Sequence, residues 1–233
     1  MTRVKICGIT SISDARAACE AGADAIGLNF YPQSRRYVSV AEASEIRKHV
    51  PSNVQVVGVF VNSIPADIRE ACVAVHLGAA QLHGDELPSM VEELAHAVAV
   101  FKAFRAGSDF RTESLKEYPS AAAFLLDAPD YGGATSGQPS AQSTRQYGGT
   151  GRLADWNIAQ KAALVHRIIL AGGLNDENVA DAVLQVRPYA VDVASGVESS
   201  TGAKDHRRLR KFIEEVRRAD QKIKNLAEKV RMT

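Results

Sequence analysis

Two reactive side chains stand at the ends of short strand-like runs in the sequence. Cys7 closes the run 4–7, and Asp127 directly follows the apolar run 124–126. A cysteine accepts a proton only as a thiolate, which requires a lowered pKa. A carboxyl group in nearly apolar surroundings stays partly protonated and can act as a general acid. We therefore interpret Cys7 and Asp127 as a candidate base–acid pair. The alternatives are structural, with Cys7 as an apolar filler and Asp127 as a helix cap or loop anchor.

Three glycine-rich segments could bind a phosphate group through backbone N–H groups. They are Gly148-Gly149-Thr150-Gly151, Ala171-Gly172-Gly173 and Ala194-Ser195-Gly196. Such turns present amides to a dianion without obstruction by side chains. One of these turns would be weak evidence, but three on one side of a fold predict a phosphate site that needs no lysine. Arg35 and Arg36 could hold a second anionic group with a bidentate guanidinium, or they could be ordinary solvated charges.

The sequence offers little for metal or covalent chemistry. We find no His, Asp and Glu cluster with metal-ligand spacing, and no lysine ends the sixth predicted strand, where it could form a Schiff base. The cysteines are Cys7, Cys19 and Cys72, an odd number without a C-x-x-C pair, which indicates neither a disulfide framework nor a zinc site. Acid–base chemistry without a cofactor remains, in a reducing compartment.

Short β-branched runs alternate with amphipathic segments and would position these side chains. We predict strands at 4–7, 25–30, 55–61, 79–82, 100–104, 122–126, 168–170 and 190–193. Helices are expected at 14–21, 40–48, 66–75, 87–96, 110–117, 155–162, 175–184 and from about 205 onwards. Ser39 and Glu42 form a capping box at the second helix. The strands are almost continuously hydrophobic, as in a parallel sheet covered by helices, and the only cluster resembling a dinucleotide-binding glycine motif comes late in the chain.

This pattern predicts one parallel eight-stranded (β/α)8 TIM barrel over residues 1–216, an α/β fold. In such a barrel the active site lies at the carboxyl ends of the strands, where Gln81, His83 and Asp192 join Cys7 and Asp127. Two segments break the regularity. A long loop at about 128–147 lacks periodicity, and we expect its central part to be a mobile insertion. Residues 217–233 alternate in charge and predict a solvated helical extension rather than a partner-binding helix.

The balance of charge excludes some partners. The 233 residues include 28 basic and 27 acidic side chains, which gives a formal net charge of +1. This balance creates no field that would attract nucleic acid or an anionic membrane. The chain has neither a secretory signal nor an apolar run long enough for a membrane helix. We expect a soluble cytoplasmic protein, and we favour a monomer over a homodimer.

Several motifs together resemble the phosphoribosylanthranilate isomerase family over residues 3 to 215. The opening Lys5-Ile6-Cys7-Gly8 combined with Leu125-Leu126-Asp127 is the most specific part of the resemblance. The other matching segments, in order, are 22–37, 57–62, 81–84, 148–156, 171–179 and 191–198. Glycine loops alone would fit several phosphate-binding barrels.

The resemblance implies an Amadori rearrangement of N-(5-phosphoribosyl)anthranilate to 1-(2-carboxyphenylamino)-1-deoxyribulose 5-phosphate in tryptophan biosynthesis. It implies that Asp127 protonates the furanose ring oxygen and that Cys7 removes the proton from C2. Arg36 would face the anthranilate carboxylate, and the three glycine segments would hold the phosphate. Gln81, His83 and Asp192 match pocket-lining positions, although His83 could equally be structural. No metal or organic cofactor is implied.

The chain departs from the family pattern in three places. Ala194 replaces a serine, which removes a hydroxyl from the third glycine segment. The loop after Asp127 is unusually long and contains Tyr131-Gly132-Gly133 as well as Tyr147-Gly148-Gly149, of which we align the second with the phosphate loop. The C-terminal extension passes the usual end of the family. Two other functions stay open: another phosphosugar-binding barrel isomerase or lyase, and a phosphometabolite-binding module without catalysis.

Overall fold

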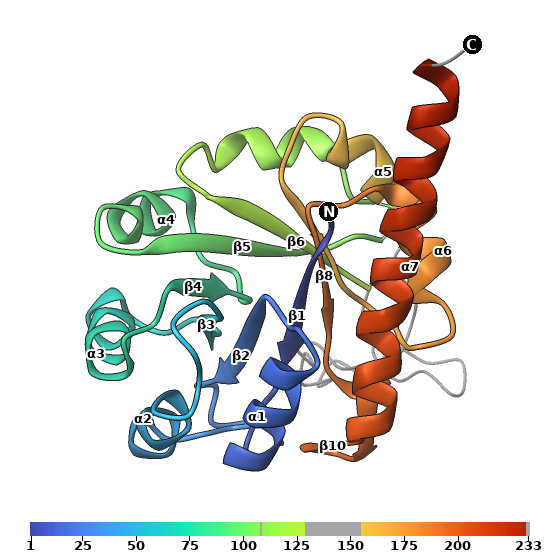
Figure 1. Cartoon of the computed structure of the whole chain (residues 1–233). Coiled ribbons are helices and arrows are strands. Elements are labelled where there is room, and N and C mark those ends of the chain that lie inside the picture. Colours follow the sequence, from blue (N-terminus) through green and yellow to red (C-terminus); the bar gives the residue numbers. More distant parts are fainter. Residues whose placement is uncertain (108, 129–154, 232–233) are drawn as a thin grey trace, which may run out of the picture.

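Eight parallel strands close into a barrel in the computed structural model, which describes residues 1–107, 109–128 and 155–231. Each strand pairs with its neighbours in chain order, and β1 pairs with β8 to complete the ring (Figure 1). The predicted TIM barrel is therefore confirmed. The strands are β1 (Arg3–Cys7), β2 (Ala25–Asn29), β3 (Gln55–Phe60), β4 (Ala79–Leu82), β5 (Ala99–Arg105), β6 (Ala123–Asp127), β7 (Ile168–Leu170) and β8 (Ala190–Val193).

Helices surround the barrel on its outer side (Figure 1). They are α1 (Ile12–Glu20), α2 (Val40–Arg47), α3 (Pro65–Val75), α4 (Pro88–Ala95), α5 (Trp156–Ala163), α6 (Val179–Val186) and α7 (His206–Arg231). Two short 3-10 helices, η1 (Thr112–Glu117) and η2 (Ser195–Val197), and a small hairpin of β9 (Glu198–Ser200) and β10 (Ala203–Lys204) complete the described elements. The capping box of α2 is present, because Ser39 and Glu42 each accept a hydrogen bond from the other's backbone N–H.

Two predicted helices differ from the structure. The segment after β5 forms only the 3-10 helix η1. The helix predicted at 175–184 begins four residues later, because Asn175 and Asn178 bind each other's backbone instead of continuing a helix. The Asn175 side chain accepts hydrogen bonds from the N–H groups of Glu177 and Asn178, and the Asn178 side chain accepts from Asn175. Asparagine favours such local turns over helix interiors.

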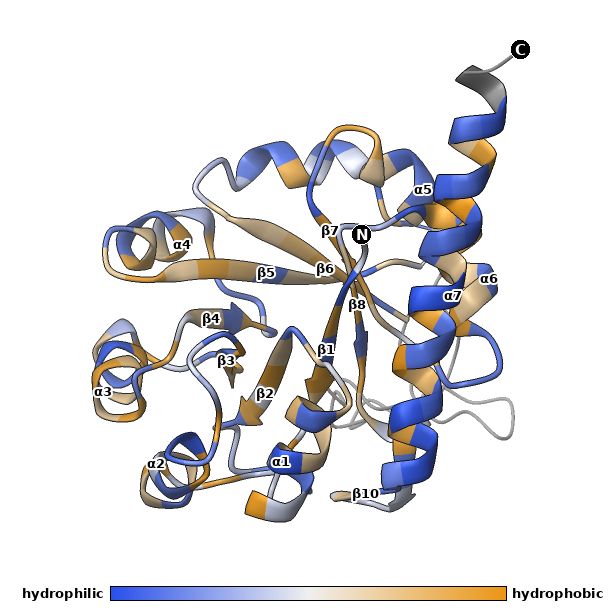
Figure 2. Ribbon diagram, viewed as in Figure 1, coloured by the Kyte–Doolittle hydropathy of each residue, from blue (hydrophilic) through white to orange (hydrophobic). Residues whose placement is uncertain are grey.

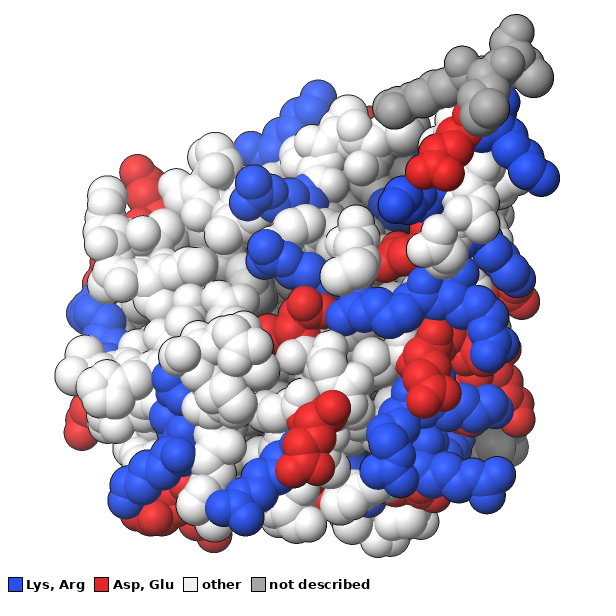
Figure 3. Space-filling model, in the orientation of Figure 1, with Lys and Arg blue, Asp and Glu red and all other residues white. Residues whose placement is uncertain are grey.

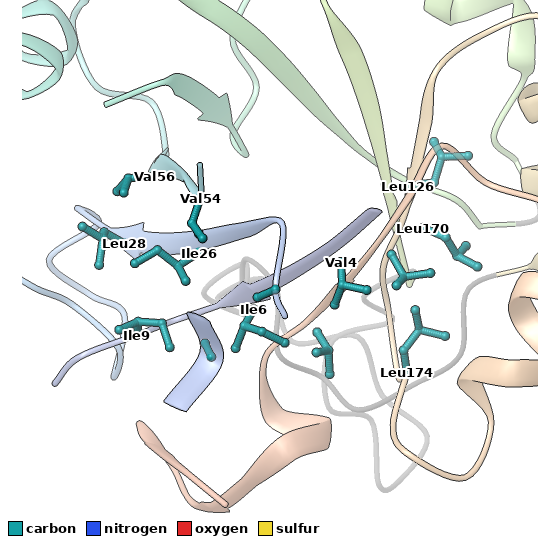
Figure 4. Close-up of a cluster of buried hydrophobic side chains, with 14 of the residues drawn as sticks. Val4, Ile6, Ile9, Ile26, Leu28, Val54, Val56, Leu126, Leu170 and Leu174 are labelled. Atoms are coloured by element: carbon teal, nitrogen blue, oxygen red, sulfur yellow. The ribbon is translucent and has the colours of Figure 1, made fainter. Parts of the chain in front are cut away.

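Alternate residues of each strand face opposite sides of the barrel wall. On β1 the outward residues Val4 and Ile6 are fully buried against helices, in a cluster that includes Leu126 and Leu170 (Figure 4). Figure 2 shows the same division, with hydrophobic strands in the centre and hydrophilic outer faces on the helices. Lys5 and Cys7 alternate with these apolar residues, so they point into the barrel. The interior is lined mainly by small side chains, including Ala25, Ala79, Ala103, Ala123, Ala171 and Ala190.

The last helix binds the residues that directly precede β1 and β2. The side chain of Asp220 on α7 accepts hydrogen bonds from the backbone N–H and the hydroxyl of Thr2, both at 2.8 Å. Arg217 donates to the carbonyl of Thr2 at 2.6 Å and forms an ion pair with Asp24 at 2.9 Å. The domain boundary predicted at residue 216 therefore falls inside one continuous helix, whose end projects beyond the barrel (Figure 1).

Charged side chains are unevenly distributed on the face shown in Figure 3. They gather over α7, where basic and acidic groups alternate, whereas much of the rest of this face is uncharged. Within the described ranges, no helix combines the length and the apolar character that crossing a membrane requires. The predicted long loop at 128–147 and the predicted phosphate segment Gly148-Gly149-Thr150-Gly151 lie outside the described residues, except for Ala128.

Candidate active site

Cys7 and Asp127 line the same pocket at the carboxyl ends of the strands. Cys7 is the last residue of β1, and Asp127 is the last residue of β6. Both occupy inward-facing positions, because they continue the alternation that places Val4 and Leu126 on the outer side. Gln81, His83 and Asp192, from β4, the loop after it and β8, line this pocket as well. The structure thus brings together side chains that the sequence separates by as many as 185 positions.

Asp127 is held between a backbone N–H and an imidazole. Its Oδ1 accepts a hydrogen bond from the N–H of Ala128 at 2.8 Å, and its Oδ2 lies 3.3 Å from Nε2 of His83. The Nδ1 of His83 lies 2.9 Å from Nε2 of Gln81. The amide of Gln81 can donate to Nδ1, which leaves Nε2 as the protonated nitrogen that faces the carboxylate. His83 thereby orients Asp127 from the end of β4, two strands away in the barrel.

A buried ion pair lies directly below Cys7 in the barrel. The ammonium of Lys5 is 2.8 Å from Oδ1 of Asp192, and the two side chains are only 3% and 9% exposed. Asp192 raises the pKa of Lys5 to about 12, although burial alone would lower it. The Lys5 ammonium also lies close to the Cys7 thiol. Gly27 on β2 leaves space for this group, because a Cβ there would lie 2.8 Å from Sγ of Cys7 and 3.1 Å from Nζ of Lys5.

The thiol of Cys7 does not have the lowered pKa that we expected for a base. Burial raises its pKa, and the charge of Asp192 raises it further. The positive charges of Lys5 and Lys204 act in the opposite direction and lower the pKa of Cys7. In the substrate-free site the protonated thiol is therefore the favoured form at neutral pH.

Arg36 lines the pocket, and one edge of its guanidinium is paired with the carboxylate of Glu198. Its Nε and Nη2 each donate to a different carboxylate oxygen of Glu198 at 2.7 Å. Lys204 reaches the same carboxylate at 2.8 Å and also donates to the carbonyl of Ala194 at 3.1 Å. This network connects the predicted anion-binding arginine with the glycine segment after β8.

Gly8 allows Arg36 to lie across the backbone after β1. Its φ of +71° is in the left-handed region, and a Cβ at this position would lie 2.3 Å from Cδ of Arg36. Any other L-residue would therefore be strained and would also displace the arginine. The group that requires a glycine at this position is therefore a side chain of the protein.

The glycine segments after β7 and β8 both line the pocket. Gly172 and Gly173 have φ values of +80° and +66°. A Cβ on Gly172 would lie 2.4 Å from the backbone nitrogen of Ala128, so the turn after β7 packs closely on the residue that follows Asp127. Ala194, Ser195 and Gly196 lead into η2. Among the described residues, these two segments are the candidates for binding an anion through backbone N–H groups.

Three residues of the site were not predicted from the sequence as functional candidates: Lys5, Glu198 and Lys204. Lys5 could have been found, because its spacing of two from Cys7 on a strand places both side chains on one face. Glu198 and Lys204 gave no such signal, since nothing local connects them with Arg36. Across the residues that the structure describes, no three His, Cys, Asp or Glu side chains are grouped so that they could hold a metal ion.

The sequence matches one protein family along most of its length. Residues 4–215 match the family model described as N-(5'phosphoribosyl)anthranilate (PRA) isomerase. The N-(5'-phosphoribosyl)anthranilate isomerase of Trichlorobacter lovleyi is 44% identical over 220 residues, which are 94% of this chain and 100% of the relative.

The chain belongs to the phosphoribosylanthranilate isomerase family.

Solved structures of this family superpose on the barrel. The phosphoribosyl anthranilate isomerase of Thermotoga maritima aligns with a TM-score of 0.82 and 39% identity, covering 93% of this chain and 99% of that one. A second structure, with a TM-score of 0.78, 37% identity and the same coverage, is a complex with reduced 1-(o-carboxyphenylamino)-1-deoxyribulose 5-phosphate. The Thermotoga protein is described as dimeric, and monomers generated from it have also been solved.

Proposed function

We propose that this chain converts N-(5-phosphoribosyl)anthranilate to 1-(2-carboxyphenylamino)-1-deoxyribulose 5-phosphate in tryptophan biosynthesis, with Asp127 as the general acid and Cys7 as the general base. The proposal depends on one observation above all: the two side chains line one pocket from β1 and β6. Membership of the isomerase family supplies the substrate.

Ring opening is the first step. The carboxyl group of Asp127 donates its proton to the furanose ring oxygen, and the bond from this oxygen to C1 breaks. The lone pair of the anthranilate nitrogen moves into the C1–N bond, so the product is a protonated Schiff base. His83, 3.3 Å from Oδ2 of Asp127, stabilises the carboxylate that remains.

Proton transfer from C2 is the second step. The Cys7 thiolate removes this proton, and the C–H electron pair forms the C1–C2 double bond and neutralises the Schiff-base nitrogen. The resulting enolamine tautomerises to the ketone. Because the resting thiol is protonated, Cys7 must lose its proton to solvent water after the substrate has bound and before it can act as the base. The positive charge of the Schiff base next to the sulfur favours that ionisation.

Two groups of residues hold the ends of the substrate. Arg36 binds the anthranilate carboxylate while Glu198 keeps its guanidinium oriented. The backbone N–H groups of residues 172–173 and 194–196 bind the phosphate, and the loss of a hydroxyl at Ala194 leaves these amides in place. The role of Gly148-Gly149-Thr150-Gly151 in the same phosphate site stays a prediction. Gln81 and Asp192 complete the wall of the pocket.

We also propose that the protein is active as a monomer, because Cys7, Asp127, Arg36 and the glycine segments after β7 and β8 line one pocket. Sedimentation at assay concentrations would test this, and turnover confined to a dimer would contradict it. A reducing compartment suits the mechanism, because Cys7 must remain a thiol. The cytoplasm therefore remains the proposed location.

Single substitutions of the two candidate catalytic residues test the mechanism. We expect Asp127→Asn and Cys7→Ser each to lower kcat by about 10²- to 10⁴-fold, which is the usual contribution of a general acid or base. Substrate affinity should change much less. The fluorescence change that accompanies consumption of phosphoribosylanthranilate measures both quantities.

Cys72→Ser is the matched control, because Cys72 lies on α3 away from the pocket. Its turnover should equal that of the parent. Undiminished turnover in Asp127→Asn or Cys7→Ser would remove that residue from the mechanism. Activity of the parent on other sugar phosphates, with none on phosphoribosylanthranilate, would favour a different phosphosugar isomerase or lyase, and binding without any turnover would favour a binding module.

A further inference from the structure

The stability of the fold does not by itself explain why a lysine–aspartate pair is buried inside the barrel. Such a pair loses hydration from both charges, and replacement by apolar side chains is often neutral or stabilising. Lys5 and Asp192 nevertheless occupy an interior that is otherwise lined mainly by alanine and larger apolar side chains. The two residues are direct neighbours on adjacent strands, because Lys5 on β1 is in register with Asp192 on β8.

The position of the lysine relative to Cys7 suggests the reason. Both side chains leave the same face of β1, and both end beside Gly27, where a single Cβ would touch Sγ and Nζ. The ammonium has two described neighbours with acidic atoms, the carboxylate of Asp192 and the thiol of Cys7. Burial leaves it little other solvation, because its side chain is 3% exposed.

We propose that Lys5 is a positioning residue that stabilises the Cys7 thiolate at the moment of proton transfer, while Asp192 holds the ammonium beneath the sulfur. This inference rests on the proposed function, since it assigns Lys5 a task only if Cys7 is the base. Lys5 remains behind the sulfur and never touches the substrate.

Other charged groups near Cys7 come from several further elements of the barrel. Lys204 on β10 favours the thiolate, and Arg36, in the loop after β2, is itself favoured in its charged form by Cys7. Asp192 disfavours the thiolate. Asp127, His83 and Tyr31 complete the charged or titratable lining of the pocket. Lys5 is the cation whose Nζ lies with Sγ of Cys7 beside Gly27, since one Cβ at that glycine would lie 2.8 Å from the sulfur and 3.1 Å from the nitrogen.

The two members of the ion pair should shift the titration of Cys7 in opposite directions. Lys5→Met removes the stabilising cation and leaves Asp192 in place, so the pKa of Cys7 should rise by about one unit or more, a tenfold change in proton affinity. Asp192→Asn removes the opposing carboxylate and leaves the ammonium to the thiolate, so the pKa should fall. A purely structural role would impair folding in both variants without this difference in sign.

The titration is measured on the thiol itself. In a background of Cys19→Ala and Cys72→Ala, the ultraviolet absorbance of the thiolate and the rate of alkylation by iodoacetamide report Cys7 alone, and circular dichroism checks folding. In variants that retain turnover, the pH at which kcat/KM rises should move in the same direction as the titration, because the base must be ionised.

Lys102 and Glu86 offer a matched control pair. Their ammonium and carboxylate are 2.9 Å apart and only 3% and 1% exposed, but Lys102 lies on the outward face of β5. Lys102→Met should leave the titration of Cys7 unchanged. The proposal is overturned if Lys5→Met does not raise the midpoint, if Asp192→Asn shifts it in the same direction, or if Lys102→Met shifts it equally. Such a failure leaves the proposed function standing, whereas full turnover of Cys7→Ser would refute the function itself.

Discussion

At the scale of single residues, Gly8 determines where Arg36 can lie. Gly8→Ala would place a methyl group against Cδ of Arg36 and would hold an L-residue at a φ of +71°. We expect the free energy of unfolding to fall by about 1–2 kcal/mol from the backbone strain. In addition, KM for phosphoribosylanthranilate should rise about tenfold or more, because the displaced guanidinium no longer meets the substrate carboxylate.

Gly22→Ala separates these two effects. Gly22 has a φ of +92°, but a Cβ there would have no neighbour within 4 Å. The two variants should therefore lose comparable stability in urea unfolding, while only Gly8→Ala raises KM. An equal KM in both variants would show that Arg36 does not depend on the glycine.

At the scale of elements, the hairpin of β9 and β10 anchors the arginine. Burial alone would raise the pKa of Glu198, but hydrogen bonds from Arg36 and Lys204 and their charges lower it below the usual value. A carboxylate with a lowered pKa stabilises the fold above its unfolded pKa, near 4.5, and this contribution is lost as the pH falls through the lower folded value. Glu198→Gln should therefore cost about 3 kcal/mol near neutral pH, because it leaves the buried Lys204 and the partly buried Arg36 without their counter-charge. At acidic pH the difference from the parent should shrink.

Urea unfolding between neutral and acidic pH measures this difference. Glu93→Gln is the control, since Glu93 pairs with Arg69 on the surface and both side chains are about half exposed. An exposed pair of this kind contributes about 0–1 kcal/mol. A pH-independent cost in Glu198→Gln would mean that the charge of Glu198 does not stabilise the hairpin.

The elements also show what could be predicted from the sequence. The alternation of apolar runs predicted all eight strands, because a parallel strand buried on both faces leaves a continuous hydrophobic signature. The start of α6 was wrong, since the side-chain turns of Asn175 and Asn178 compete with a helix in a way that periodicity does not register. The pairs Lys5–Asp192 and Arg36–Glu198 were not predicted, because closure of the barrel brings together residues that no local pattern relates.

At the scale of the whole molecule, α7 serves two purposes along its length. Arg217 and Asp220 bind the N-terminal strand, whereas the side chains of residues 224–229 are exposed. Truncation after Val216 should therefore lower the free energy of unfolding by about 3 kcal/mol, through the lost hydrogen bonds to Thr2 and Asp24. The corresponding fall in melting temperature is on the order of 5–10 °C.

Truncation after Ile223 should change the free energy of unfolding by less than about 0.5 kcal/mol, because it removes mainly solvated surface. Thermal unfolding of both truncated chains, monitored by circular dichroism, distinguishes them. Equal losses would mean that the solvated end of α7 contributes as much as the part bound to β1.

Because β1 pairs with β8, the barrel can close, and the active site can form, only late in translation. The strand that carries Cys7 is translated before the other seven strands, yet its partner β8 and its anchor Asp220 follow only after β2 to β7. Contacts between such distant parts of a chain form slowly. The nascent polypeptide therefore carries an unpaired β1 edge and an unshielded sulfur through most of its synthesis, and it acquires a working pocket only once the last helix has emerged.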